Sequence, residues 1–206
     1  MSFPYCSVFN VDPIFYPLQD FCVADLNSTT ILNGFPCKPM SKVTSNDFFY
    51  SGLMDEASTA NPLGIGVRLG DVTTFPGLNT LGLSINLIEL AAGGIVQIHT
   101  HPRASEANFV IKGEVLFGFV STTSVLYAKV MKAGELSIIP RGLVHFAINV
   151  RHEKAVVIST FNSQLPGFAS IPYNLFASNP TIPNDILAKN FQVGEAVIAL
   201  IKSKFN

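Results

Sequence analysis

Three of the four histidines in this 206-residue chain lie in two short segments whose residue types could hold a metal ion. His99 and His101 are separated by one residue, Glu106 follows them, and His145 comes in a later segment. Three imidazoles and one carboxylate would leave one or two positions of an octahedral metal open to water or substrate. This donor set suits Mn, Fe, Ni, Cu or Zn, and the ligand types alone do not choose among these metals.

The spacing of the four side chains indicates strands and turns that would aim them at one point. Side chains two residues apart in a strand share a face, so a strand would point His99 and His101 together. The turn at 102–105 would let an antiparallel return strand bring Glu106 opposite them. A Pro-Arg-Gly turn would start the strand that carries His145.

A simpler interpretation of these histidines stays open at this point. A His-x-His pair in a strand is usually not a metal site, and Pro-x-Gly is often only a turn. The concentration of three histidines in two segments with fitting turns favours the metal site. The fourth, His152, lies between Arg151 and Glu153 and is most simply a solvated loop residue.

The middle of the chain has the pattern of short strands that could position such a site. Segments rich in Val, Ile, Phe and Thr alternate with turn residues at spacings of about 8–12 residues, which is typical of a sandwich or barrel. The predicted strands span 80–90, 96–101, 107–111, 115–120, 125–130, 135–139, 145–150 and 155–161.

The two ends of the chain differ from this middle. Residues 1–50 predict a turn-rich arm with one or two short strands, and 51–67 predict a loop that passes into a strand. Four prolines in 163–183 predict an extended crossing segment. Residues 184–191 and 194–205 predict two helices. We expect the apolar side of the second helix to pack on another subunit, with packing on its own barrel as the alternative.

The composition excludes several classes of function. Hydrophobic residues make up 48% of the chain and charged residues 13%, which is not the composition of a disordered protein. The net charge is -1, so nothing indicates a basic surface for nucleic acid. With so few charges, we expect apolar surface to be buried between subunits. No apolar run reaches about 18 residues, so we expect no membrane span.

Two of the three cysteines indicate the compartment. Cys22 and Cys37 flank a short loop, where a disulfide would add about 3 kcal/mol in the chain-entropy account. The loop contains Asn27-Ser28-Thr29, an N-glycosylation acceptor. Together they favour an oxidising, extracellular setting, with three free thiols in a cytosolic protein as the alternative. Cys6 would then be free.

The start of the chain is apolar and aromatic. The first basic residue is Lys38, so the basic region of a secretory signal is missing from the opening residues. We expect residues 1–17 to be an N-terminal extension or signal remnant. Residues 18–206 are then expected to form a single domain.

Both histidine segments resemble the two motifs of the cupin superfamily as plant germins carry them. The first motif is matched by Gly93, His99-Thr100-His101, Glu106 and Gly113, and the second by Gly134, Pro140-Arg141-Gly142, His145 and Asn149. The resemblance to germins and germin-like proteins extends over nearly the whole chain, through the segments LQDFCVADL at 18–26, CKPMS at 37–41, FPGLNTLGLSIN at 75–86, TFNSQLPG at 160–167, LFASNPTIP at 175–183 and LIKSKF at 200–205.

This resemblance implies more than spacing alone. It implies an all-β fold, a single cupin barrel of the jelly-roll type with C-terminal α-helices. It implies a homohexamer, a trimer of dimers with the helical tail in the contacts, and secretion to the plant extracellular space, the apoplast. It implies Mn²⁺ held by His99, His101, Glu106 and His145. Cys22–Cys37 would be the family disulfide.

The predicted substrate pocket argues against oxalate oxidation, one of the family's activities. Oxalate oxidases in the family hold the dianion with two asparagines near the metal. Asn86 matches one of them, but Val96 stands at the position of the other. An alkyl group there would cost the dianion a charge-assisted hydrogen bond, about 1.5–3 kcal/mol. Phe109 and Phe117 are expected to add aromatic bulk near the site, with Ile98 and Val110 as further candidates for an apolar lining.

The sequence and the family resemblance are compatible with three functions. The first is manganese superoxide dismutase activity, because superoxide is small and needs a redox-active metal with one open position. The second is a metal-dependent or acid-base enzyme that acts on an apolar plant metabolite in the barrel. The third is a non-catalytic, glycosylated extracellular wall or binding protein.

Overall fold

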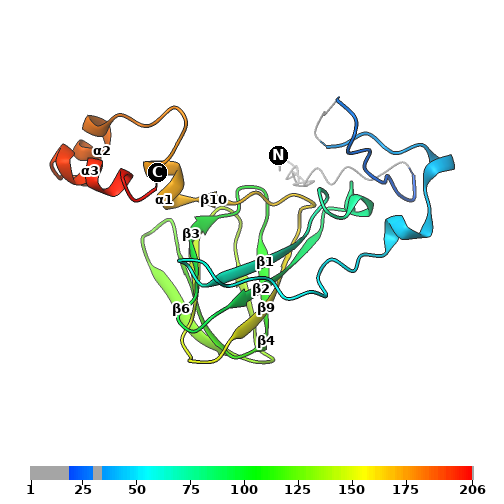
Figure 1. Cartoon of the computed structure of the whole chain (residues 1–206), viewed down its shortest axis with the longest axis horizontal. Helices are drawn as coiled ribbons and strands as arrows, with labels where there is room; N and C mark the ends of the chain where they lie inside the picture. Colours follow the sequence, from blue (N-terminus) through cyan, green and yellow to red (C-terminus); the bar gives the residue numbers. More distant parts are fainter. Residues whose placement is uncertain (1–18, 30–33, 206) are drawn as a thin grey trace, which may run out of the picture.

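The structure, a computed structural model that describes residues 19–29 and 34–205, is a barrel of two antiparallel sheets (Figure 1). The first sheet has the strand order β1-β2-β9-β4-β7 and the second has the order β10-β3-β8-β5-β6. The all-β fold with C-terminal helices that we expected is confirmed. The strands are Ile65–Gly70 (β1), Ser84–Leu90 (β2), Ile95–Thr100 (β3), Glu106–Lys112 (β4), Glu114–Val120 (β5), Leu126–Lys132 (β6), Leu136–Ile139 (β7), Val144–Asn149 (β8), Ala155–Phe161 (β9) and Ala169–Ser170 (β10).

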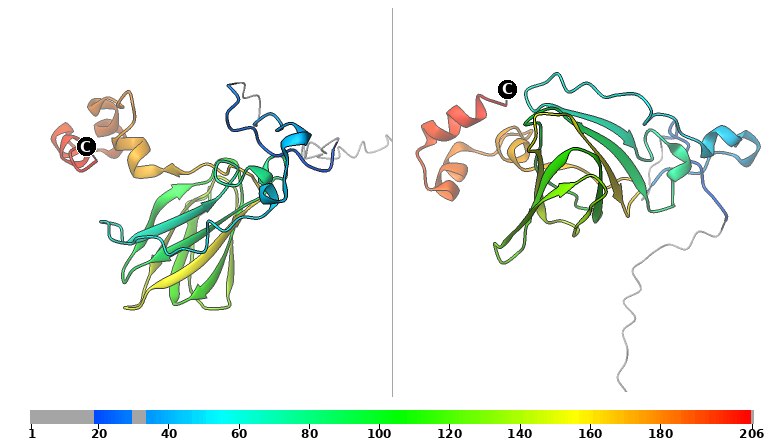
Figure 2. Two further views of the ribbon diagram at one scale, coloured as in Figure 1. Left: turned by 45° about the vertical axis from the view of Figure 1, so that its right-hand side comes forward. Right: turned by 90° about the horizontal axis from the view of Figure 1, so that it is seen from below.

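The core lies between the two sheets, because alternate side chains of each strand point inward. Along β8 and β9, fully buried residues alternate with less buried ones. The main core cluster takes Leu90, Val110 and Val157 from the first sheet, and Val115 and Met131 from the second. The view from below in Figure 2 shows the two sheets facing each other around this interior.

The described part of the N-terminal arm, residues 19–29 and 34–50, contains no regular strand, contrary to the prediction. Among its described residues, one isolated bridge joins Ala24 to Cys37, and the rest consists of turns and short 3-10 helices at Met40–Lys42 and Ser45–Phe48. The expected Cys22–Cys37 disulfide is present and closes this arm. Asn27 lies exposed in a turn of the same loop. Residues 1–17 and Cys6 lie outside the described residues.

The segment after β9 also differs from the prediction. It was expected to cross as an extended chain, but it forms β10 and then a helix, α1, at Ile171–Phe176. Ser170 caps this helix by accepting a hydrogen bond from the Tyr173 N–H at 3.4 Å. Pro172 sits in the first turn, where no N–H is needed, so this proline starts a helix and does not mark extended chain.

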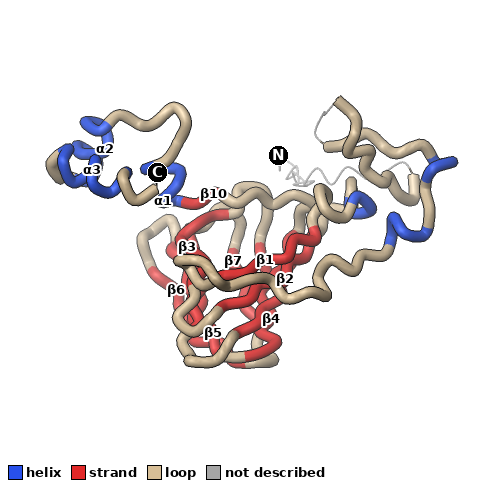
Figure 3. Tube along the Cα trace, viewed as in Figure 1, coloured by secondary structure: helices blue, strands red, loops and turns tan. Residues whose placement is uncertain are grey.

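The two predicted C-terminal helices are present as α2 (Asn184–Phe191) and α3 (Glu195–Lys202). They stand off one end of the barrel, at the side opposite the N-terminal arm, in both Figure 1 and Figure 3. Leu187, Ala188 and Ile198 form a small buried cluster of their own, separate from the barrel core. No helix in the described ranges has the length and apolar character needed to cross a membrane.

Candidate metal centre

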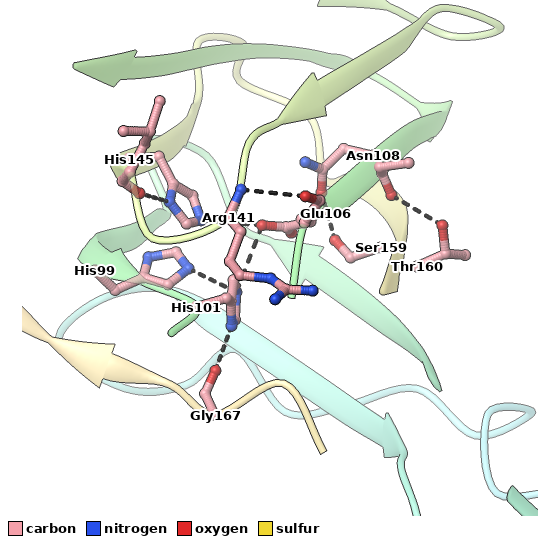
Figure 4. A network of polar contacts seen from close by, with 12 residues as sticks. His99, His101, Glu106, Asn108, Arg141, His145, Ser159, Thr160 and Gly167 are labelled. Atoms are coloured by element: carbon pink, nitrogen blue, oxygen red, sulfur yellow. Dashed lines mark hydrogen bonds and ion pairs between the residues drawn. The ribbon is translucent and has the colours of Figure 1, made fainter. Parts of the chain in front are cut away.

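The four predicted ligands come together inside the barrel. One donor atom from each of His99, His101, Glu106 and His145 lies within 4.8 Å of the others, and all four residues are buried. The first sheet contributes Glu106, which is the first residue of β4. The second sheet contributes His99 on β3 and His145 on β8, which are direct register partners. The cluster therefore joins the two sheets (Figure 4).

A local irregularity in β3 sets which of its side chains face the interior. The register between β3 and β8 shifts between Val96 and His99, as in a β-bulge. Strict alternation would put residues three apart on opposite faces, but the bulge lets both Val96 and His99 be buried. Ile98 points outward and is 44% exposed. Val96 and the histidines therefore share one cavity.

Backbone carbonyls fix the orientation of the three imidazole rings. His99 Nδ1 lies 2.7 Å from the Gln97 carbonyl oxygen and His145 Nδ1 lies 2.8 Å from that of Leu143. His101 Nδ1 contacts the carbonyl oxygen of Gly167. A carbonyl oxygen can only accept, so each Nδ1 carries a proton and each ring turns its Nε2 toward the centre.

The inward-facing donor atoms leave an electrostatic conflict that a cation would resolve. His99 Nε2 lies 3.2 Å from His101 Nε2, and His145 Nε2 lies 2.9 Å from the Glu106 carboxylate oxygen. With the protons of His99 and His101 on Nδ1, their two Nε2 lone pairs face each other without a hydrogen between them, whereas His145 Nε2 lies within hydrogen-bonding distance of the carboxylate. Three nitrogens and one carboxylate oxygen converging in this way fit a divalent metal of the first transition series.

Burial and neighbouring charges set the protonation of the cluster. Burial, and then the proximity of His145, lower the pKa of His99 to about 3. Burial also lowers the pKa of His101. Burial alone would raise the pKa of Glu106, but the hydrogen bond from His145 and the nearby imidazoles bring it below its ordinary value. Near neutral pH, His99 and His101 are therefore free of protons on Nε2 and Glu106 is charged, as metal ligands must be.

A cavity of about 470 Å³ begins at this cluster and runs through the barrel. Asn86 and Val96 line it, as predicted, and so do Phe117 and Asn108. The exposed members of its lining include Val67 and Leu69 of β1 and Phe168, so the cavity reaches solvent between β1 and the segment 162–168.

The prediction that Phe109 lines the pocket is wrong. Phe109 is 40% exposed and is absent from the cavity lining, which takes its neighbour Asn108 instead. In β4 the inward residues alternate from Glu106, so Asn108 and Val110 face the interior and Phe109 faces out. Counting two residues from Glu106 would have found Asn108 in the sequence. Val110, which is fully buried, and Ile98, which is exposed, are also outside the cavity lining.

The segment 162–168 is a part of the site that sequence reasoning missed. We call it the strap. The Phe168 ring stacks on His99 with ring centroids 4.4 Å apart, and Gly167 contacts His101. Arg103, from the turn between His101 and Glu106, donates from Nε to the Leu165 carbonyl oxygen at 2.8 Å. No local signal marks the strap, because its contacts join residues far apart in the chain.

Comparisons with known proteins agree with this fold and site. The family model described as cupin matches residues 51–199. Germin-like protein subfamily T member 2 of Arabidopsis thaliana is 53% identical over 189 residues, which cover 92% of this chain and 85% of that protein. A rhicadhesin receptor of Pisum sativum is 48% identical over 91% of this chain and 86% of its own. An oxalate oxidase solved with the substrate analogue glycolate superposes with a TM-score of 0.89 at 45% identity, covering 92% of this chain and 96% of that chain.

A double-sheet antiparallel barrel with three histidines and one glutamate gathered in its interior defines the cupin class, and this chain has both features. Within that class, its extended identity to germin-like proteins shows that it belongs to the germin and germin-like family. The resemblance found in the sequence is thereby confirmed.

Proposed function

We propose that this protein is a manganese-dependent superoxide dismutase. The observation that carries the proposal is the convergence of four buried donor atoms at the end of a cavity that reaches solvent. Dismutation combines two superoxide ions and two protons to give one O₂ and one H₂O₂. A bound manganese ion would supply the chemistry by taking an electron from one superoxide and giving it to the next.

The protein's own residues would hold and tune that metal. His99, His101, His145 and Glu106 are the proposed ligands. Their three neutral rings and single carboxylate would leave a divalent ion with one net positive charge, which attracts a small anion. The carbonyls of Gln97, Gly167 and Leu143 would keep the ring nitrogens aimed. The protons would enter from solvent through the cavity mouth.

Oxalate oxidation is disfavoured by the cavity wall. Val96, at the position where oxalate oxidases of the family carry an amide, is buried and lines the cavity. Asn86, at the position of the family's other asparagine, accepts a hydrogen bond from the Gly70 N–H through Oδ1 at 3.3 Å. Among the described lining residues there is no Lys or Arg, so a dianion would have no positive side chain to pair with its second carboxylate.

The first test is metal analysis and superoxide dismutation by purified protein loaded with manganese. Activity should resist cyanide and disappear on metal removal, and His101→Ala should lower both metal content and activity at least about 100-fold. The matched control is His152→Ala, because His152 is exposed and outside the cluster. Manganese-loaded protein without dismutation would overturn the proposal.

Two alternatives keep specific support. The large, apolar cavity favours a metal-dependent or acid-base enzyme acting on an apolar metabolite. The similarity to a protein named as a rhicadhesin receptor favours a non-catalytic extracellular binding protein. If the His101→Ala variant loses the biological role of the protein, an enzyme is favoured. If the folded variant keeps that role, the binding protein is favoured.

The setting that we propose is extracellular and oligomeric. The Cys22–Cys37 disulfide is typical of oxidising compartments, and the exposed turn position of Asn27 would allow a glycan. Exposed apolar side chains on the C-terminal helices, among them Ile186, Val197 and Leu200, support a homo-oligomer, for which the family resemblance implies a hexamer. We also retain the proposal that residues 18–206 form one domain.

A further inference from the structure

The cavity is much larger than superoxide requires. At about 470 Å³ it lies within the range of pockets that enclose organic ligands, whereas one water takes about 30 Å³ of liquid. A site used by a diatomic anion alone needs no such space. The volume of the cavity therefore leaves room for a second, larger ligand.

The walls change in character in steps along the barrel. In the first sheet, the strand register places Glu106 beside Phe161, then Asn108 beside Ser159 and Asn86, and then Val157 beside Ile88. Successive inward positions along a strand are about 6.7 Å apart. A carboxylate row is thus followed by an amide row and then by an apolar row, over about 13 Å.

The second sheet faces this gradient with a mostly apolar surface, in which Gln97 is the polar exception. Beyond the pair formed by His99 and His145, the next inward residues in register are Val96, Ala147 and Phe117. β1 closes the remaining side with Val67, the register partner of Ile88, and Leu69, the partner of Asn86. A ligand in the cavity would therefore meet polar groups at the cluster end and hydrocarbon over most of its length.

The charges of the lining restrict the ligand further. Its charged side chains, among the described residues, are Glu106 and Asp71, and Asp71 already accepts from the Thr73 N–H at 2.8 Å. With no Lys or Arg in the lining, one anionic group could be neutralised only at the metal, and a second anionic group would be left unpaired. A single carboxylate on an apolar body satisfies both conditions.

We propose that the cavity binds a monocarboxylate with an extended apolar body, its carboxylate at the four-ligand cluster and its body against Ile88, Val157 and Val67. The proposal rests on the proposed function in one respect, since the metal that would receive the carboxylate is the one assigned there. Such a ligand would occupy the path of superoxide and compete with it.

The test is calorimetric titration of octanoate, acetate and octanol into manganese-loaded and metal-free protein. Octanoate should bind the manganese-loaded protein most tightly. Its affinity should exceed that of acetate by about fourfold for each methylene that contacts the cavity wall. Octanol, and octanoate with metal-free protein, should bind at least about tenfold more weakly. Equal affinities for acetate and octanoate would contradict the proposal that the cavity binds an apolar body. Equal octanoate affinities with and without metal would contradict the proposed position of the carboxylate at the cluster.

Two valine substitutions locate the body of the ligand. Val67→Asp places a charge in the cavity wall and should weaken octanoate binding at least about tenfold. Val130→Asp is the matched control, because both valines lie on edge strands with 41% and 39% exposure, and Val130 is outside the lining. Leu69→Gln serves as a second variant should Val67→Asp not fold. Unchanged octanoate binding in a folded variant at either cavity position would overturn the assignment.

Dismutation measured on the same manganese-loaded samples separates the two proposals. Protein that dismutates superoxide but does not bind octanoate would contradict the proposed ligand and leave the proposed function intact. Protein that binds octanoate but does not dismutate superoxide would remove the proposed function and leave the ligand site.

Discussion

At the scale of single residues, we propose that Val96 distinguishes this site from one that holds oxalate. Its side chain is buried beside the metal cluster, where the β-bulge in β3 turns it inward. An amide in its place would add a donor at the polar end of the cavity. We therefore propose that this residue affects the choice of anion more than the four metal ligands do.

Val96→Asn should therefore strengthen oxalate binding by the manganese-loaded protein about tenfold to a hundredfold, the value of one hydrogen bond to a charged group. Ile98→Asn is the matched control, since Ile98 lies on the same strand but faces outward. Oxalate binding is measured by titration calorimetry. Equal oxalate affinity in the wild-type and Val96→Asn proteins would contradict the role given to this position.

The four ligands could be predicted from the sequence because their positions follow local rules. His99 lies in β3 and His101 directly follows the end of that strand, so alternation still aims both at the interior, and the turn after them is short. Phe109 was misplaced although the same rule, counted from Glu106, selects Asn108. The bulge that brings Val96 inward has no such rule, because it depends on pairing with β8.

At the scale of elements, the strap 162–168 connects the ends of the site. It joins the turn of the first histidine motif through Arg103 and supports His101 through the Gly167 carbonyl. Neither contact could be derived from spacing, because both depend on how β9 leaves the barrel. The helix α1 was missed for a different reason, since a proline in the first turn of a helix resembles one in extended chain.

Gly167→Ala should push the Arg103 guanidinium away from the strap, loosen its bond to Leu165 and weaken metal retention about tenfold to a hundredfold. A Cβ on Gly167 would lie 2.9 Å from Arg103 Nη2, and the residue has a φ of +74°. The matched control is Gly93→Ala, whose φ is +67° but whose Cβ would meet nothing within 4 Å, so it carries the same backbone strain without the clash. Metal content after dialysis against a chelator reports the difference. Equal retention in both variants would show that the strap does not support His101.

At the scale of the whole molecule, the C-terminal helices have more apolar surface than their own small core can bury. Leu200 is 60% exposed and Ile186 is 55% exposed, while α2 and α3 enclose a separate cluster at one end of the barrel. The barrel could be predicted as a class from strand spacing. The position of the helices could not, because no pattern in the sequence specifies which surface they pack against.

Leu200→Asp should lower the oligomeric state, since it places a charge where we propose a subunit contact. Met54→Asp is the control, because Met54 is an exposed apolar residue at 82% and lies in a loop outside the helices. Molar mass from light scattering during gel filtration distinguishes the two. An unchanged molar mass for Leu200→Asp would show that the apolar surface of the C-terminal helices is not a subunit contact.

The cluster draws its ligands from both sheets, Glu106 from one and the histidines of β3 and β8 from the other. A bound ion would therefore also be a cross-link across the barrel, and an ion at about a hundred times its dissociation constant adds about 2.7 kcal/mol to the free energy of unfolding. Maturation of the chain and acquisition of its metal would then be one event. Chains that leave synthesis without an ion would open more readily, and cellular quality control would remove them before they could act.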